Sequence, residues 1–167
     1  MFGSVGDWLY QSLAGIRQPE SSTGYRQIVF QPPPSNVLLF SGLRGVNASL
    51  EWLAGRVASS WFIADDGSSF TVRVSVPSQS TANVTIPLLD YSAFVITESG
   101  RPVWRDNGFV PGVPGVQAAR ATNEAVVFSV ASGNYVFVIA NGKTSVRCTR
   151  THAAHAAHAH LTHPWTR

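Results

Sequence analysis

The sequence predicts a mainly β protein: an antiparallel β-sandwich of about eight strands, preceded by one N-terminal α-helix and followed by a disordered His/Ala tail. Three observations lead to this prediction. Before Pro19, apolar residues recur every three or four positions, as on one face of a helix. After Tyr25, apolar and polar residues alternate in short runs separated by turn residues. No helical pattern lies between those runs, which argues against a parallel α/β sheet.

The N-terminal helix is expected to end at Gly15, which suits a left-handed cap, and Pro19 prevents its continuation. Ser4 is the expected N-cap, and Asp7 three residues further on resembles a capping box. A helix of about three turns is marginal alone in water, so its apolar face needs a partner surface. The residues expected on that face are Val5, Trp8, Leu9, Leu13 and Ile16.

Strands are expected wherever the alternating pattern runs. The Pro32-Pro33-Pro34 run ends the first of them, because proline cannot donate a hydrogen bond to a sheet. Asp65-Asp66-Gly67 is a hairpin turn signal, and Asn107–Gly115 is a Gly/Pro-rich loop. The expected strands are Tyr25–Phe30, Val46–Trp52, Arg56–Ala64, Phe70–Val76, Thr81–Pro87, Ala93–Thr97, Pro102–Trp104, Glu124–Val130 and Tyr135–Ala140.

Three segments are therefore expected: a helix over residues 1–18, a β-sandwich domain over 19–146, and a disordered or weakly helical tail over 147–167. Cys148, the only cysteine, lies in the tail and cannot form an internal disulfide. Imidazoles on such a tail bind zinc, nickel or copper, but an alanine-rich segment lacks the partners of a built site. We expect adventitious metal affinity and no cofactor; the histidines concerned are His152, His155, His158, His160 and His163.

Composition and charge exclude several classes of protein. Hydrophobic residues make up 44% of the chain, which is enough for one core. Residues 1–146 hold nine basic and nine acidic residues, so the net charge of +3 arises in the tail, and no nucleic-acid-binding face is expected. No stretch is long enough to span a membrane, and the N-terminus does not resemble a signal peptide. We expect no membrane partner, and the localisation stays open.

No catalytic residues are expected. Asp65 and Asp66 are the only adjacent acidic residues, and the turn explains them. No histidine precedes the tail, so the folded part has no Ser/His/Asp triad. Five other acidic residues are scattered, and nothing in their spacing pairs them: Glu51, Asp90, Glu98, Asp106 and Glu124.

The five tryptophans raise the alternative of sugar binding, because an indole face suits a pyranose ring. Trp52 and Trp61 lie in expected strands and are assigned to the core. Trp104 stands just before a loop and is the best exposed candidate for a substrate-binding residue. The Trp8 side of the helix is assigned to docking.

Short motifs follow one another in a specific order over about residues 1–140. They are Phe2–Tyr10, Ala14–Ile16, Gly24–Pro32, Gly55–Trp61, Val76–Pro87, Glu98–Val103 and Ser132–Phe137. This series resembles the junction between the catalytic and C-terminal domains of bacterial-type α-L-rhamnosidases, glycoside hydrolase family seventy-eight. The resemblance implies a C-terminal β-sandwich joined to the last helix of a six-fold α-helical catalytic toroid, so that residues 1–18 would be a remnant of the toroid.

The resemblance also implies where the chemistry lies. In that family, acidic residues of the toroid hydrolyse terminal α-L-rhamnosides with inversion, and they lie upstream of the matched stretch. A sugar-site histidine usually precedes the segment that begins here at Phe2, but this chain begins at Met1. We therefore expect a fragment that lacks the catalytic carboxylates and is inactive alone.

Three hypotheses remain open at this point. The first is a non-catalytic accessory domain whose partner is the catalytic toroid of a parent enzyme. The second is a stand-alone carbohydrate-binding module, for which rhamnose-containing glycans are the candidate ligands. The third is an active glycosidase. Sugar titration separates the first two hypotheses, and a hydrolysis assay tests the third.

Overall fold

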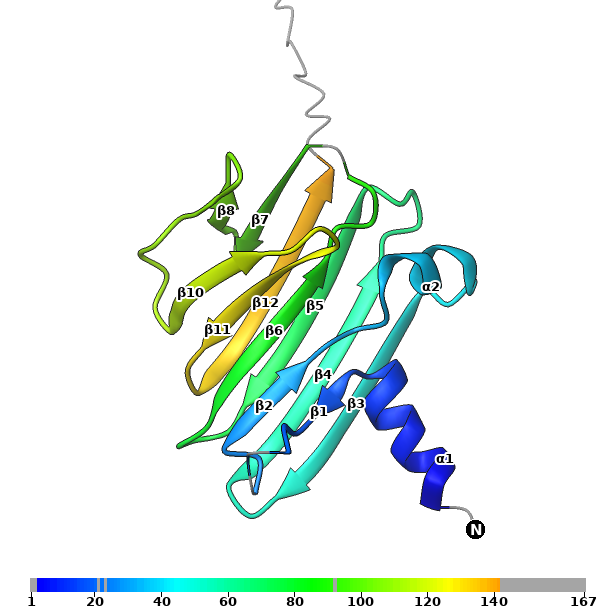
Figure 1. The fold of residues 1–167 in the computed structure, drawn as a ribbon, viewed down its shortest axis with the longest axis vertical. Coiled ribbons are helices and arrows are strands. Elements are labelled where there is room, and N and C mark those ends of the chain that lie inside the picture. Colours follow the sequence, from blue (N-terminus) through cyan, green and yellow to red (C-terminus); the bar gives the residue numbers. More distant parts are fainter. Residues whose placement is uncertain (1–2, 21, 23, 92, 142–167) are drawn as a thin grey trace, which may run out of the picture.

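Two β-sheets packed face to face form the body of the molecule (Figure 1). The structure, a computed structural model, describes residues 3–20, 22, 24–91 and 93–141. The five-stranded sheet has the order β1 (Ile16–Arg17), β2 (Gln27–Phe30), β6 (Thr81–Pro87), β11 (Ala125–Val130) and β10 (Val116–Ala121). The seven-stranded sheet has the order β3 (Gly45–Trp52), β4 (Gly55–Ile63), β5 (Ser69–Val76), β12 (Gly133–Asn141), β7 (Phe94–Glu98), β8 (Arg101–Arg105) and β9 (Gly108–Phe109).

The core lies between the inner faces of the two sheets. Phe128 of one sheet and Phe137 of the other are both fully buried, and their stacked rings have centroids 4.9 Å apart. In β5, Phe70 and Val72 are fully buried while Arg73 between the inward positions is exposed, as the alternating pattern predicted. Burial of these rings supplies the main stabilising term of the sandwich.

The sandwich predicted from the sequence is confirmed, with one strand pair that is not antiparallel. β2 runs parallel to β6, and Phe30 lies opposite Val84. The chain leaves β2, builds three strands of the other sheet, and then returns to form β6 beside β2. Such a long connection is what a parallel pair requires.

A short helix, α2 (Ser35–Phe40), lies between β2 and β3, where no helix was expected. It follows the proline run directly, since Pro34 occupies the N-cap position with an extended backbone. Only Leu38 of this helix is buried. Six residues are too few to show a helical repeat in the sequence, which explains the wrong prediction.

The leading helix consists of α1 (Gly3–Trp8) and a π-helical turn, η1 (Leu9–Leu13). It begins at Gly3, one residue before the expected cap Ser4. Gly15 turns the chain with φ +73°, as predicted, and its carbonyl accepts a hydrogen bond from the Gln31 amide at 2.8 Å. The prediction for Ile16 is wrong: it lies in β1 and is 1% exposed, because the turn at Gly15 directs it into the sheet.

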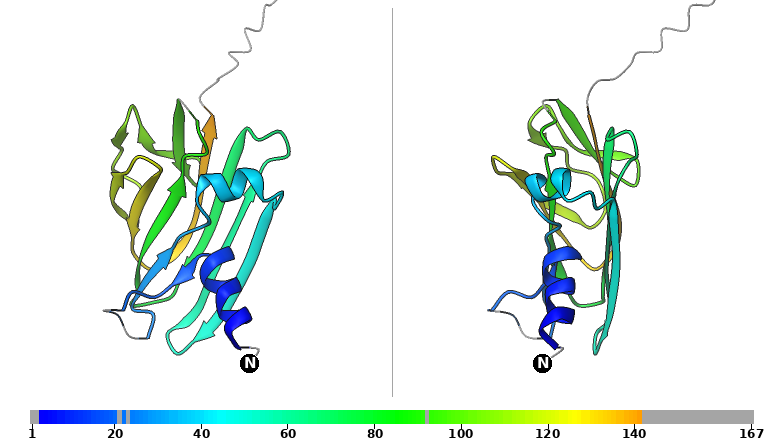
Figure 2. Two further views of the ribbon diagram at one scale, coloured as in Figure 1. Left: turned by 45° about the vertical axis from the view of Figure 1, so that its right-hand side comes forward. Right: turned by 90° about the vertical axis from the view of Figure 1, so that its right-hand side faces the viewer.

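Both helices lie along the edge of the sandwich formed by the outermost strands β1 and β3 (Figures 1 and 2). The loop expected over residues 107–115 contains β9, and the next six residues form β10, which was also not predicted. Among the described residues, no helix has the length and apolar character needed to cross a membrane.

Candidate functional site

The end of the leading helix is fixed to the sandwich by two hydrogen bonds. Trp61 Nε1 in β4 donates to the carbonyl of Leu13 at 2.8 Å, and Ser59 Oγ donates to the carbonyl of Ala14 at 2.8 Å. Both donors come from side chains that are 1% exposed. They satisfy carbonyls that a helix end would otherwise leave without partners. The helix is thus anchored at its C-terminal end.

The opposite part of the same helix presents apolar side chains to solvent. Val5, Trp8 and Leu9, which we call the leading-helix face, are 59%, 55% and 45% exposed. Tyr10 beside them reaches back to the sandwich, and its hydroxyl donates to the Ser49 carbonyl at 3.3 Å. The docking role expected for Trp8 stays a prediction; what the structure gives is an anchored helix with an exposed apolar face, which is the form such a surface takes.

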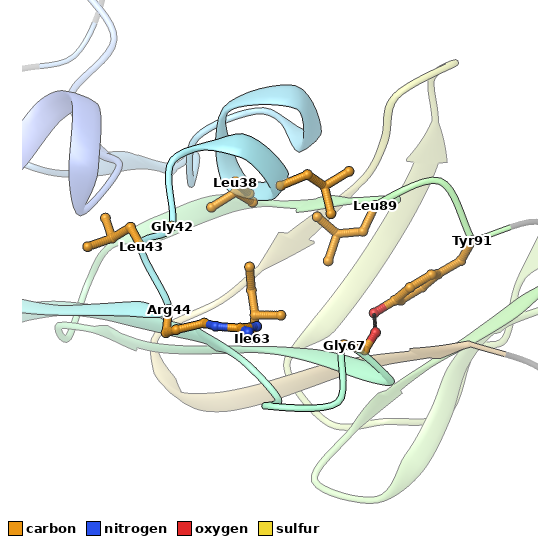
Figure 3. Close-up of a pocket in the computed structure, with 9 residues that line it drawn as sticks. Leu38, Gly42, Leu43, Arg44, Ile63, Gly67, Leu89 and Tyr91 are labelled. Carbon is orange, nitrogen blue, oxygen red and sulfur yellow. Dashed lines mark hydrogen bonds between the residues drawn. The ribbon is translucent and has the colours of Figure 1, made fainter.

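Two hollows lie beside α2. The first, of about 210 Å³, is lined mainly by leucine and isoleucine, with Arg44 as its one charged lining residue among those described (Figure 3). Tyr91 closes one end, where its hydroxyl donates to the Gly67 carbonyl at 2.7 Å. Burial raises the pKa of Tyr91, and the nearby Asp66 carboxylate raises it further.

The second hollow, which we call the α2 hollow, is larger, at about 650 Å³. Three segments that are distant in sequence form it: α2, the β6–β7 loop and the β10–β11 turn. Its lining residues are Pro34, Ser35, Asn36, Leu39, Phe40, Leu88, Asp90, Tyr91, Asn123 and Glu124. The mixture of rings, amides and carboxylates distinguishes it from the apolar first hollow.

Hydrogen bonds between these three segments hold the α2 hollow in shape. The Leu88 amide donates to the Glu124 carbonyl at 2.9 Å, and the Leu89 amide donates to Ser35 Oγ at 3.2 Å. Leu89 and Asp90 both adopt left-handed backbone conformations, with φ 50° and 58°. Each such residue costs about 1–2 kcal/mol, which the surrounding contacts must offset.

The structure brings together two carboxylates that the sequence did not pair, Asp90 and Glu124. The register of β6 with β11 places Pro87 opposite Ala125, so the residues that follow and precede these strands lie side by side. Only a correct prediction that β6 pairs with β11 could have shown that Asp90 and Glu124 lie close together. Both side chains are exposed, whereas a glycosidase general acid is enclosed in an apolar pocket.

The tryptophans differ from expectation at two positions. Trp104 is only 5% exposed, because it belongs to the buried core cluster, so the expected exposure is wrong; β9 pairs beside its strand and sets Phe109 opposite it. A sugar-binding role for Trp104 stays a prediction. It assumed an exposed indole face, and the structure does not have one at this position. Trp52 was assigned to the core but is 43% exposed, and its ring meets Tyr25 edge-on at 5.1 Å. Trp61 lies in the core, as expected.

The acidic pair Asp65-Asp66 lies in the turn between β4 and β5, as predicted. Asp66 accepts a hydrogen bond from the Ser68 amide at 2.9 Å, and hydrogen bonding from the Ser68 side chain and amide lowers the pKa of Asp66. In the described part of the chain, no three His, Cys, Asp or Glu side chains gather as metal ligands. Cys148 and the histidines His152, His155, His158, His160 and His163 lie outside the described residues.

Comparison with known proteins gives consistent results. Residues 15–101 match the family model described as "Bacterial alpha-L-rhamnosidase C-terminal domain". The α-L-rhamnosidase of Streptomyces avermitilis is 33% identical over 138 residues, which cover 83% of this chain and 11% of that protein. The α-L-rhamnosidase of Formosa agariphila is 33% identical over 86 residues, which cover 52% of this chain and 8% of that protein.

Solved structures show the same relationship. The α-L-rhamnosidase from Dictyoglumus thermophilum superposes with a TM-score of 0.68 at 28% identity, over 83% of this chain and 14% of that one. The Streptomyces avermitilis α-L-rhamnosidase complexed with L-rhamnose gives a TM-score of 0.60 at 28% identity, over 82% of this chain and 11% of that one. This chain therefore spans only a small part of the length of the relatives that it matches.

Proposed function

The chain belongs to the bacterial α-L-rhamnosidase C-terminal domain family, and from this premise we propose that it is a non-catalytic accessory domain of an α-L-rhamnosidase. The parent enzyme would hydrolyse terminal α-L-rhamnosides with a separate catalytic domain. The coverage of the relatives supports this proposal, because the matched segment makes up 11% of the Streptomyces avermitilis enzyme. The catalytic domain is then the partner of this chain.

The leading-helix face is the single observation that carries the proposal. Its side chains are exposed although the helix end is hydrogen-bonded to buried residues of β4. A contiguous apolar surface on a fixed element is typical of an interface. We propose that the catalytic domain covers this face and that the sandwich, through Trp61 and Ser59, holds the helix in position.

The carboxylates of the chain fit a structural role better than a catalytic one. Inverting hydrolysis needs a general acid and a general base on opposite sides of the glycosidic bond. Asp90 and Glu124 share one hollow, but both are exposed. Glu98 is 6% exposed, and it accepts a hydrogen bond from Ser99 Oγ at 2.6 Å within a turn. Neither arrangement encloses a pair of carboxyls around a substrate.

A hydrolysis assay on the purified 167-residue chain tests the non-catalytic role. An aryl α-L-rhamnoside should release its aryl group no faster with the folded protein than with buffer, because the residues that the structure describes form no enclosed acid–base pair. Far-UV circular dichroism confirms that the assayed protein is folded. Release that is proportional to protein concentration, and that Asp90→Asn or Glu124→Gln abolishes, would overturn the proposal and assign catalysis to the α2 hollow.

A further inference from the structure

We propose that the α2 hollow is a binding site for a neutral sugar, which it holds without hydrolysing it. This inference goes beyond the docking role of the leading helix and does not depend on it. It rests on the charge of the hollow, its hydrogen-bonding groups, its exposed aromatic ring and the contacts that hold its walls in place.

The charge of the hollow excludes an anionic ligand. Asp90 and Glu124 are the charged side chains among its described lining residues, and no lysine, arginine or histidine lies among them. A phosphate, sulfate or uronic acid would be repelled from such a wall. A metal ion is also disfavoured, since no cluster of three acidic, histidine or cysteine ligands occurs in the described part of the chain.

The polar side chains of the hollow match the hydroxyl groups of a sugar. The amides of Asn36 and Asn123 each offer donors and an acceptor, and the two carboxylates each offer acceptors. Adjacent hydroxyls of a pyranose act as donors and acceptors at once, so they pair well with amides and carboxylates. A ligand without hydroxyl groups would leave these polar groups without partners and pay for their desolvation.

Phe40 provides the apolar part of the site. It is 87% exposed, the most exposed aromatic residue among the large hydrophobic side chains on the described surface. The face of an aromatic ring is electron-rich and attracts the slightly positive C–H groups on one face of a pyranose. Leu39 beside it adds a surface for a methyl or methylene group of the sugar. Polar groups and an aromatic ring in one hollow are what a small polyol ligand needs.

The walls of the hollow are positioned before any ligand arrives. The backbone bond from Leu88 to Glu124 joins two walls, and the bond from Leu89 to Ser35 joins the third. Leu89 itself is 4% exposed and anchors the β6–β7 loop in the core. Preorganisation of this kind reduces the entropy that binding must offset.

The two surfaces of the molecule differ in the kind of ligand they suit. The leading-helix face consists of Val5, Trp8 and Leu9 and suits an apolar protein surface. The α2 hollow is concave, and carboxylates and amides line it together with the Phe40 and Tyr91 rings, which a protein core would not cover without leaving charges buried. A sugar in solvent contact covers the Phe40 ring and keeps the charges hydrated.

Titration of the full chain with methyl α-L-rhamnopyranoside and methyl α-D-mannopyranoside tests this proposal, with acyclic sorbitol as the control ligand. Amide chemical shifts in the segments around Phe40, Asp90 and Asn123 should saturate with a millimolar dissociation constant for at least one pyranoside. Phe40→Ala should weaken that binding about tenfold or more, because it removes the stacking surface. Asn123→Ala should weaken it less.

Leu53→Ala serves as the matched control, since Leu53 is 100% exposed in the β3–β4 turn, away from the hollow. It should leave the dissociation constant unchanged. Shifts that rise linearly without saturation for both pyranosides would overturn the proposal. So would equal binding by wild type and by both hollow variants, Phe40→Ala and Asn123→Ala. Either result leaves the accessory role intact, because that role is tested by hydrolysis and by the leading helix.

Discussion

The sandwich core and the leading helix use the same kinds of side chain in opposite environments. In the core, Phe70, Phe128 and Phe137 are fully buried between the sheets. On the helix, Val5 and Trp8 remain more than half exposed. The sandwich therefore covers its own apolar residues, whereas the apolar residues of the helix are left exposed by the described part of the chain.

The hydrogen bonds show that the helix is not a loose end. Its last carbonyls are bonded to Trp61 and Ser59, and the Gly15 carbonyl accepts from Gln31 at 2.8 Å. The helix is therefore held in place at its C-terminal end although the apolar side chains nearer its N-terminal end stay exposed. This difference is the physical basis of the proposal that the domain holds the helix for a neighbouring catalytic domain.

The largest expected effect on stability comes from a substitution in the core. Phe128→Ala should lower the free energy of unfolding by about 3–5 kcal/mol, because it removes a stacked ring from a close-packed interior. Trp8→Ala, which removes a larger but exposed ring, should change it by less than about 0.5 kcal/mol. Urea unfolding followed by circular dichroism measures both values. Similar losses for the two variants would show that the helix face is already covered.

A smaller effect is expected at the joint between the two regions. Gly15→Ala should cost about 2–3 kcal/mol, because a Cβ there would overlap the Gln31 carbonyl and the φ of +73° disfavours a side chain. Gly6→Ala is the matched control within α1, where an added Cβ meets no atom within 4 Å. It should leave stability unchanged or raise it by up to about 1 kcal/mol. Equal costs for the two substitutions would contradict the assigned joint.

The smallest expected effect is on how the stability of the sandwich depends on pH. Burial raises the pKa of Tyr91 above its ordinary value, so the folded state holds the phenolic proton more tightly than the unfolded state does. The resulting stabilisation is present below about pH 10 and is lost as pH rises through the raised pKa. The free energy of unfolding should therefore fall less steeply in alkali for Tyr91→Phe than for wild type. Identical pH profiles would show that the Tyr91 proton does not contribute.

The regular part of the fold could be predicted from the sequence because side-chain alternation reports burial directly. β5 and β6 lie within one residue of their expected bounds, since each has one face in the core. Gly15 was identified because a left-handed turn favours glycine. β10 was missed because most of its residues are exposed at a sheet edge, so no alternation appears.

The site was harder to predict because it depends on contacts between distant segments. Asp90 and Glu124 share a hollow only through the pairing of β6 with β11, and Phe40 stands there because of a helix too short to recognise. Trp104 was placed on the surface by its position before a loop, yet that loop contains a strand that pairs with β8, and the Trp104 ring lies in the core. Local patterns predict which residues face a core, and they do not predict which loops meet.

The central claim is that the leading-helix face is built to be covered by another protein surface. Sedimentation velocity of the full chain over a range of concentrations tests it most directly. Wild type should associate reversibly as concentration rises, Trp8→Ser should remain monomeric, and Leu53→Ser, which alters a fully exposed leucine elsewhere, should behave as wild type. A wild-type chain that stays monomeric throughout, or association that Trp8→Ser leaves unchanged, would contradict the claim.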